Sequence, residues 1–243
     1  MAKNLNIEKA AAEFRASNGF GTINPIRLKS LLLNLKVLTV YKDMDTSFSG
    51  MSLKIDEEKF MLLNSLHPIG RQHFTICHEL YHLFVQKDFE HIICDDNIEP
   101  KEKAEENNAD IFAVNLILPQ DGVLKLIPEE ELKRDRVSIK TILEIEQYYA
   151  CSHRAMLRRL VGMELLTERK AEELLPDIKK RASEYGYDLS LYEPGNKDVI
   201  IGDYGVKARQ LFENEIISNA HYIELMRDIG IDLENPDNDS DEK

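Results

Sequence analysis

Residues 71–82 read RQHFTICHELYH. They lie within a longer segment, 69–85, that is apolar on nearly all sides when it is arranged as a helix. A helix of this kind is buried in a protein core, because none of its faces favours water. In its second half three residues with imidazole or carboxylate side chains interrupt the apolar pattern, His78, Glu79 and His82. Buried groups of this type are unfavourable unless they are paired or bound to a metal, so the segment predicts a core helix with a polar site.

The spacing of these three residues indicates a metal site. His78 and His82 are four residues apart, which places both imidazoles on one helix face, one turn from each other. Two nitrogens so placed can bind one tetrahedral zinc ion at about 2.1 Å each. Glu79 projects about 100° further round the helix, where a carboxylate can accept a proton from metal-bound water. This H-E-x-x-H pattern predicts His78 and His82 as ligands and Glu79 as the catalytic base; the alternative is a pair of hydrogen-bonded core histidines.

A third ligand is expected from a helix that begins at Pro100 and ends at Pro119. The apolar face of this helix, projected back by one turn, includes Glu106 and Asp110. We predict that Glu106 completes the metal site and that Asp110 accepts a hydrogen bond from the far nitrogen of a ligand histidine, which fixes the imidazole ring. The alternatives for the third ligand are Glu102, Glu105, His91 and Asp95.

The rest of the chain predicts an α+β protein in which a small sheet packs on helices. Three β-branched or apolar runs predict strands at residues 37–41, 49–55 and 59–63. The last two are expected to form a hairpin, so the sheet is expected to be mostly antiparallel. Asn24-Pro25 is typical of a helix start and predicts a helix to about Leu35. Other helices are expected at 6–17, 138–150, 152–164, 167–185 and 204–229, with a linker at 186–197.

Composition excludes several classes of function. The chain has 31 basic and 44 acidic residues, a net charge of −13, so neither nucleic acid nor an anionic membrane attracts it. Three cysteines, Cys77, Cys94 and Cys151, are too few for a disulfide framework and fit a reducing compartment. No apolar run is long enough to span a membrane, and the first residues lack the apolar segment of a signal peptide. We therefore expect a cytoplasmic protein.

Three regions are expected along the chain. Residues 1–135 are predicted to form the domain with the metal site, 136–232 a helical C-terminal region, and 233–243 a disordered acidic tail, since almost all of the tail is polar. Arg154, Arg158 and Arg159 would suit a DNA-reading helix-turn-helix. In so acidic a chain, we favour a structural helix pair.

The sequence resembles the ImmA/IrrE family of metallo-endopeptidases. The matching segments are 71–82 (RQHFTICHELYH), 106–119 (ENNADIFAVNLILP) and 150–160 (ACSHRAMLRRL), of which the last is similar to the helix-turn-helix-like segment of the family. The resemblance covers roughly residues 25–166. One departure is Tyr81, where the family often has glycine; this bulkier side chain can narrow the cleft but removes no ligand.

The resemblance implies a zincin-like fold with one zinc ion held by His78, His82 and Glu106 and with Glu79 as the base. It also implies a bacterial endopeptidase. Members of the family cleave Xre-type helix-turn-helix repressors, like those of phages, and so switch on repressed genes in mobile elements and stress responses.

Other features of the mechanism are left open. A second donor to the oxyanion is expected, with His153 and Tyr149 as the first candidates and Tyr81, Tyr148 and His91 as others. The strand at 49–55 is expected to be an exposed edge that can hold an extended substrate. Competing hypotheses are a non-catalytic regulator or antitoxin-like binding protein on a zincin scaffold, and a general zinc protease of another zincin family.

Overall fold

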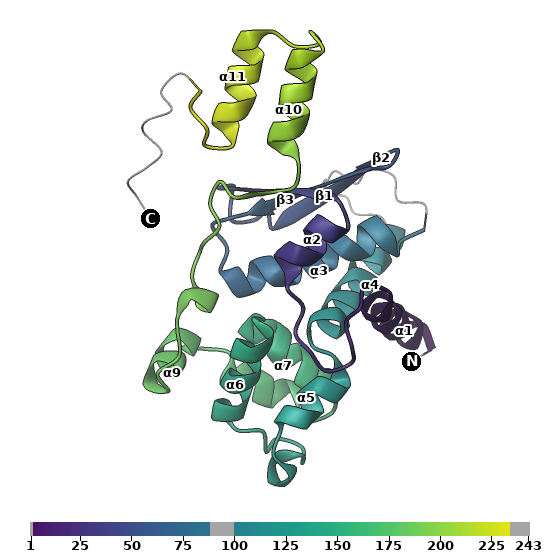
Figure 1. The fold of residues 1–243 in the computed structure, drawn as a ribbon. Helices are drawn as coiled ribbons and strands as arrows, with labels where there is room; N and C mark the ends of the chain where they lie inside the picture. Colours follow the sequence, from purple (N-terminus) through teal and green to yellow (C-terminus); the bar gives the residue numbers. More distant parts are fainter. Residues whose placement is uncertain (1, 88–99, 234–243) are drawn as a thin grey trace.

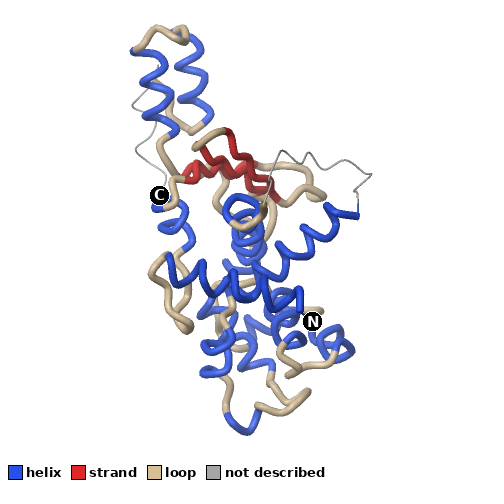
Figure 2. The backbone as a smooth tube through the Cα atoms, turned by 90° about the vertical axis from the view of Figure 1, so that its right-hand side faces the viewer, coloured by secondary structure: helices blue, strands red, loops and turns tan. Residues whose placement is uncertain are grey.

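A computed structural model describes residues 2–87 and 100–233 of the chain; of the side chains of 2–4 and 100–102 nothing is described. His91, Asp95 and residues 234–243 of the expected tail lie outside this range. Figures 1 and 2 show the arrangement: a small sheet lies between a helical hairpin on one side and a body of helices on the other. The expected α+β fold with a zincin-like core and a helical region is confirmed.

The sheet has four strands in the order β2-β3-β1-β4: β1 (Val37–Lys42), β2 (Gly50–Ile55), β3 (Glu58–Asn64) and β4 (Ile200–Ile201). β2 and β3 form the expected antiparallel hairpin, β1 pairs with β3 in parallel, and β4 is antiparallel to β1. The sheet is thus mixed rather than mostly antiparallel as expected, because its central strands β1 and β3 run in parallel, and β2 lies at its edge. Sequence pattern does not predict β4, because two residues are too few to separate a strand from a loop.

One face of the sheet is buried by α2 (Leu28–Asn34) and α3 (Ile69–Phe84). α2 begins later than Asn24-Pro25 predicts. The Arg15 guanidinium donates to the backbone oxygens of Gly21 and Asn24, and these bonds hold the segment before α2 as a loop. Proline and a capping side chain were therefore not enough to start the helix.

The long core helix α3 lies between the sheet and α4 (Pro100–Ile117), and α1 (Ala2–Ser17) covers α4 in turn. Ile76 and Leu80 of α3 and Phe112 of α4 are fully buried. α3 therefore meets protein on almost every side, which explains why its sequence is apolar nearly all round.

The helices that follow α4 extend the same core. They are α5 (Gln120–Leu126), a short 3₁₀ turn η1 (Glu129–Glu131), α6 (Ile139–Tyr149) and α7 (His153–Gly162). Ser138 and Ser152 cap α6 and α7 by accepting from backbone amides. One hydrophobic cluster contains Leu80 of α3 as well as Ile142 and Leu160. The core thus continues past residue 135, and the division into domains there stays a prediction.

The expected single helix at 167–185 is wrong. The structure has two, α8 (Glu168–Leu174) and α9 (Ile178–Glu184). Pro176 lies between them, and proline has no amide hydrogen and clashes with the preceding helical turn. Asp177 takes a left-handed conformation, with φ of 60°, which also breaks the helix.

The expected linker at 186–197 is packed rather than free. It contains the 3₁₀ turn η2 (Ser190–Tyr192), in which Leu191 and Tyr192 are buried. Gln72 of α3 donates to the backbone oxygen of Gly195 at 2.9 Å and accepts from the Asn196 amide at 2.8 Å. These bonds hold the segment along α3 and lead the chain back to β4.

A helical hairpin, α10 (Tyr204–Glu213) and α11 (Asn219–Asp228), follows β4 and lies above the sheet in Figure 1. Lys207 forms an ion pair with Glu58 of β3.

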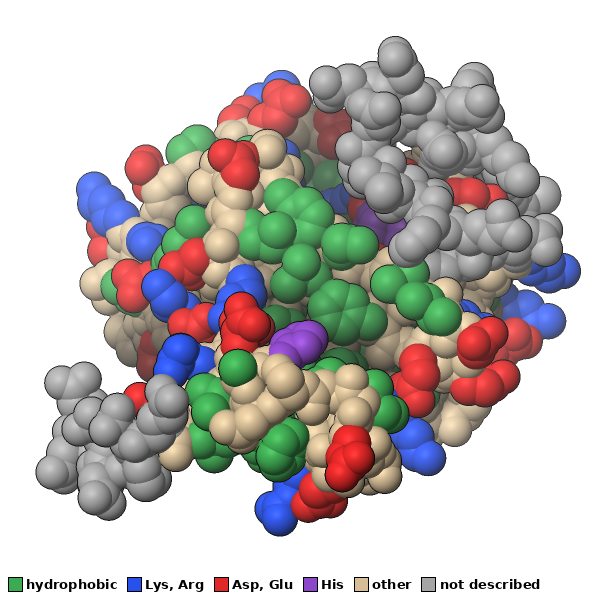
Figure 3. Space-filling view, turned by 90° about the horizontal axis from the view of Figure 1, so that it is seen from above, with side chains coloured by type: hydrophobic (Ala, Val, Ile, Leu, Met, Phe, Trp, Pro, Cys, Tyr) green, Lys and Arg blue, Asp and Glu red, His purple; other side chains and the backbone are tan. Residues whose placement is uncertain are grey.

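Seen from above, the surface of the molecule has hydrophobic side chains near its middle, among charged ones (Figure 3). In the described parts of the chain no helix has the length and apolar character needed to cross a membrane.

α3 and the turn before α7 meet backbone to backbone at Gly70. A Cβ atom on this residue would lie 2.9 Å from the amide nitrogen and 3.0 Å from the Cα of Ser152. One turn later, Nδ1 of His73 lies 2.7 Å from the backbone oxygen of Ala150. The absence of a side chain at Gly70 therefore sets how closely α7 approaches α3.

We expect Gly70→Ala to lower the free energy of unfolding by roughly 1–3 kcal/mol, because the added methyl group pushes two backbones apart. Urea denaturation measures the change. Gly162→Ala is the matched control: Gly162 is also helical, and nothing lies within 4 Å of its Cβ position, so alanine should leave stability unchanged or raise it slightly. Equal unfolding midpoints for Gly70→Ala and the wild type would contradict this packing.

Candidate metal centre

Three predicted ligand residues come together between α3 and α4. Nε2 of His78 lies 3.0 Å from Oε2 of Glu106 and 3.2 Å from Nε2 of His82, and Nε2 of His82 lies 3.4 Å from Oε1 of Glu106. The ligand atoms that the three residues offer all lie within 4.8 Å of one another. The alternative ligand Glu105 instead accepts a hydrogen bond from the Tyr81 hydroxyl, at 2.5 Å. The side chain of Glu102 is not described.

These residues fit a divalent metal ion. Ligand atoms at about 2.1 Å from a tetrahedral ion lie about 3.4 Å from one another. In the structure the separations are 3.0–3.4 Å when each histidine is compared with the Glu106 oxygen that faces it, and all lie within 4.8 Å when each residue offers a single atom. Two imidazoles and one carboxylate form the donor set of catalytic zinc sites, in which the fourth position stays open. The Glu106 side chain is 42% exposed, against 15% and 5% for His78 and His82, so the open side of the cluster faces solvent.

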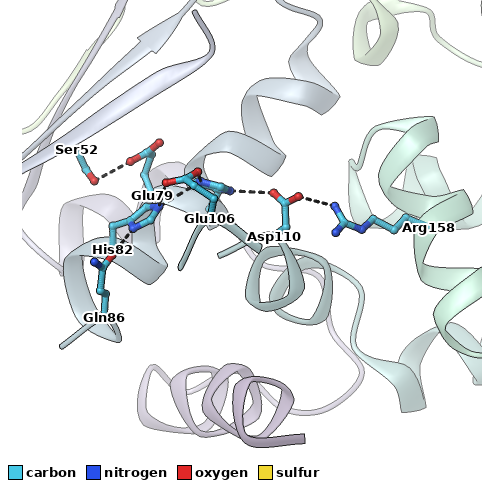
Figure 4. A network of polar contacts seen from close by, with 8 residues as sticks. Ser52, Glu79, His82, Gln86, Glu106, Asp110 and Arg158 are labelled. Atoms are coloured by element: carbon cyan, nitrogen blue, oxygen red, sulfur yellow. Dashed lines mark hydrogen bonds and ion pairs between the residues drawn. The ribbon is translucent and has the colours of Figure 1, made fainter. Parts of the chain in front are cut away.

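The far nitrogen of each histidine is held by an acceptor (Figure 4). Nδ1 of His78 donates to Oδ1 of Asp110 at 3.0 Å, and Arg158 of α7 donates to the other oxygen of Asp110 at 2.6 Å. Nδ1 of His82 donates to the side-chain oxygen of Gln86 at 2.5 Å. Both rings are thereby turned so that their Nε2 atoms face Glu106.

The charges of the cluster stabilise one another. Burial lowers the pKa of His78, but its hydrogen bonds to Asp110 and Glu106 outweigh this effect and raise the pKa to about 10. The hydrogen bond from His78 lowers the pKa of Glu106. Burial raises the pKa of Asp110, and the bonds from His78 and Arg158 more than reverse this. Both carboxylates are therefore anionic at neutral pH and favour positive charge at the cluster, on the His78 ring between them or on a metal ion beside Glu106.

Glu79 projects from α3 toward the sheet and is buried. The Ser52 hydroxyl, on edge strand β2, donates to Oε2 of Glu79 at 2.7 Å. β2 reaches α3 because Gly50 has no side chain: a Cβ there would lie 2.6 Å from Cγ2 of Thr75. The strand thus holds one oxygen of the predicted base. The only sign in the sequence that Ser52 bonds Glu79 is that a hydroxyl residue occupies a position of the strand that faces the core.

A cavity of about 680 Å³ opens onto the cluster. Residues 47–52, at the start of edge strand β2, line one wall, and the beginning of α7 lines another. The apolar lining comes from Phe48, Met51, Phe74 and Ala155. The cavity is large enough for several side chains of an extended peptide.

Two site predictions need correction. His153 and Tyr149, the expected oxyanion donors, are both absent from the cavity lining. The His153 nitrogens are bonded to Glu146 at 2.5 Å and to the backbone oxygen of Leu174 at 3.0 Å. The Tyr149 hydroxyl donates to the backbone oxygen of Ile23. The helix pair α6–α7 turns both side chains into its own packing, which residue type alone does not reveal.

The remaining candidates also have other surroundings. The Tyr81 hydroxyl is bonded to Glu105, Tyr148 is exposed and packs edge-on against Tyr149, and His91 lies outside the described residues. Cys77, next to His78 in the sequence, is fully buried in the core, and burial raises the pKa of its thiol to about 12.

The arginines of α7 do not share one exposed face. Arg154 and Arg158 line the cavity, whereas Arg159 is buried. A helix that reads DNA presents its basic residues together on an open surface. The arrangement favours the structural helix pair.

The comparison with known families agrees with this geometry. The sequence model of peptidase family M78, described as the IrrE N-terminal-like domain, matches residues 34–161, which is 161 − 34 + 1 = 128 of the 243 residues. The chain therefore belongs to the ImmA/IrrE family. The match includes every residue of the cluster, and the family supports a metallopeptidase-type function. No curated protein matches the chain.

We expect the purified protein to bind one divalent ion per chain and Glu106→Ala to lose it, since two imidazoles alone hold a metal weakly. Asp110→Asn should weaken metal binding by about 10- to 100-fold, because the His78 ring loses the carboxylate that orients it.

Metal binding should also weaken as the pH falls, because a proton on His78 competes with the metal. Elemental analysis after dialysis against a range of pH values measures all three effects.

Glu105→Ala is the control for this experiment. Glu105 is the neighbour of Glu106 on α4, but its carboxylate is bonded to Tyr81. Loss of the metal in Glu105→Ala together with retention in Glu106→Ala would show that the ligand set is wrong.

Proposed function

We propose that the protein is a zinc-dependent endopeptidase. The observation that carries this proposal is the cluster of His78, His82 and Glu106, with ligand atoms within 4.8 Å of one another, beside the buried carboxylate of Glu79 and open to a cavity. When bound, zinc supplies a Lewis acid that polarises a carbonyl and lowers the pKa of a water molecule to about 7.

In this proposal Glu79 is the general base and then the general acid. The hydroxyl of Ser52 holds Oε2 of Glu79, which leaves Oε1 to accept a proton from the attacking water and to pass it to the leaving amine. Asp110 keeps the His78 ring in one orientation, and Arg158 holds Asp110. A base fixed in this way loses little orientational freedom when the substrate reacts.

The substrate is proposed to bind as an extended strand beside β2. β2 is the edge of the sheet, and residues 47–52 line the cavity. An extended peptide that adds to this edge forms backbone hydrogen bonds, while the cavity receives its side chains. This mode suits cleavage within a chain, because it needs no free terminus of the substrate.

We further propose that the substrate is an Xre-type helix-turn-helix repressor in the bacterial cytoplasm, whose cleavage switches on repressed genes. Membership of the ImmA/IrrE family supports this proposal. So does charge: a protein with a net charge of −13 attracts basic DNA-binding proteins and is repelled by the DNA itself. A non-catalytic regulator would not need a carboxylate buried at the position of Glu79, so the geometry favours catalysis.

Replacement of Glu79 by glutamine tests the proposed chemistry. Glu79→Gln keeps the size of the side chain but cannot accept the proton, so we expect repressor cleavage to fall at least about 100-fold while the metal content stays that of the wild type. The assay follows a purified Xre-type repressor on a gel over time. Undiminished cleavage by Glu79→Gln would rule out the proposed base.

Casein serves as a second substrate in the same assay. An enzyme specific for repressors should leave casein intact. Broad cleavage of casein by the wild type would instead support a general zinc protease.

A further inference from the structure

The cavity at the metal centre has a basic end that the proposed chemistry does not use. Arg71 of α3 and Arg154 and Arg158 of α7 line it, and all three side chains are exposed. The chain as a whole has a net charge of −13, so this end differs in sign from most of the surface. The carboxylates of the same cavity, Glu79, Glu106 and Asp110, belong to the metal centre, and Asp110 is paired with Arg158, so a positive potential is expected only beside Arg71 and Arg154.

Two of these arginines lack an acidic partner. Arg158 forms an ion pair with Asp110. Arg71 donates to the neutral Ser49 hydroxyl, at 2.7 Å, and within residues 2–87 and 100–233 neither Arg71 nor Arg154 forms an ion pair. Within the same residues, other exposed arginines, such as Arg134 and Arg136, also form no ion pair, but Arg71 and Arg154 differ from them because they line the cavity. Arg71 and Arg154 are therefore available to a charged group from another molecule.

Arg71 and Arg154 also lie near enough to affect each other. Burial is the larger cause that lowers the pKa of Arg71, and the positive charge of Arg154 is the next. Two guanidinium groups that repel each other gain most from an anion placed between them. Their repulsion in the free protein therefore favours binding of a negatively charged group.

The fold fixes the backbone positions of Arg71 and Arg154 relative to each other. Gly70, next to Arg71, lets α3 touch the backbone of Ser152, which caps the helix that carries Arg154. Ser49, just before β2, holds the guanidinium of Arg71. The basic end thus lies on the joined ends of two helices, and the bond to Ser49 orders the side chain of Arg71 before a ligand binds.

We propose that Arg71 and Arg154 form a specificity subsite that binds the carboxylate of an aspartate or glutamate in the substrate. This inference rests on the proposed peptidase function and adds the kind of side chain that the substrate must carry. A planar guanidinium matches a carboxylate in a two-bond geometry. The apolar residues Phe48, Met51 and Phe74 of the same cavity suit hydrophobic side chains near the acidic one.

Peptide binding to the zinc-loaded Glu79→Gln protein tests the subsite. The probes are fluorescein-labelled decapeptides of alanine with a central leucine, which carry one glutamate or one glutamine at each position in turn. At one position of the peptide we expect the glutamate peptide to bind about fivefold more tightly than the glutamine peptide. This preference for glutamate should weaken at high salt. Fluorescence anisotropy measures the affinities.

Charge reversal identifies the residues. Arg154→Glu, made in the Glu79→Gln protein, should lose the preference for glutamate and bind the matching lysine peptide better than the glutamate peptide. Arg71→Gln, a milder change, should reduce the preference, and urea unfolding checks that both variants fold. Arg136→Glu is the control, because Arg136 is exposed and does not line the cavity; it should keep the wild-type preference.

Equal affinity for glutamate and glutamine at every position, or no binding of either, would overturn the proposal. So would a preference that survives in Arg154→Glu, or tight binding of a duplex DNA probe that depends on Arg154. Repressor cleavage by the wild type is measured separately. If the wild type cleaves no repressor but the preference for glutamate peptides is present, the peptidase proposal fails and the proposal of an anion-binding subsite stands.

Discussion

The burial of three ionisable side chains on one core helix is the constraint on which the site depends. His78, Glu79 and His82 lie on α3 between the sheet and α4, where a lone charge is unfavourable. Each has a specific partner from another part of the chain. Asp110 and Glu106 of α4 bond His78, Ser52 of β2 bonds Glu79, and Gln86, just beyond α3, bonds His82. The packing of α3 against these elements therefore also assembles the candidate metal centre.

The site uses more of the chain than the motif suggests. Arg158 of α7 holds Asp110 and so acts on His78 through one intermediate residue. The family match ends at residue 161, within α7 (His153–Gly162), and thus includes this arginine. The contact of Gly70 with Ser152 brings α7 to the cavity. We infer that α7, although it follows residue 135, is part of the site as well as of the core.

Local patterns predicted the fold, and they also pointed to three residues that the structure brings together. The i, i+4 spacing of His78 and His82 and the apolar stripe that points to Glu106 are properties of single helices, which sequence reveals directly. Partners that come from distant elements were not predictable: Ser52 and Arg158 reach the site only through tertiary packing. For the same reason His153 was misassigned, since its two hydrogen bonds depend on how α6 and α8 surround it. Pro176 was a visible signal for the break between α8 and α9.

The central claim is that residues from two helices share one zinc ion. X-ray absorption at the zinc edge of the purified, zinc-loaded protein tests it most directly, because it reports the atoms bound to the metal. The account predicts nitrogen and oxygen neighbours at about 2.0–2.2 Å, with the outer-shell scattering of two imidazole rings. A sulfur neighbour at about 2.3 Å, or a shell of oxygen atoms without imidazole scattering, would contradict it.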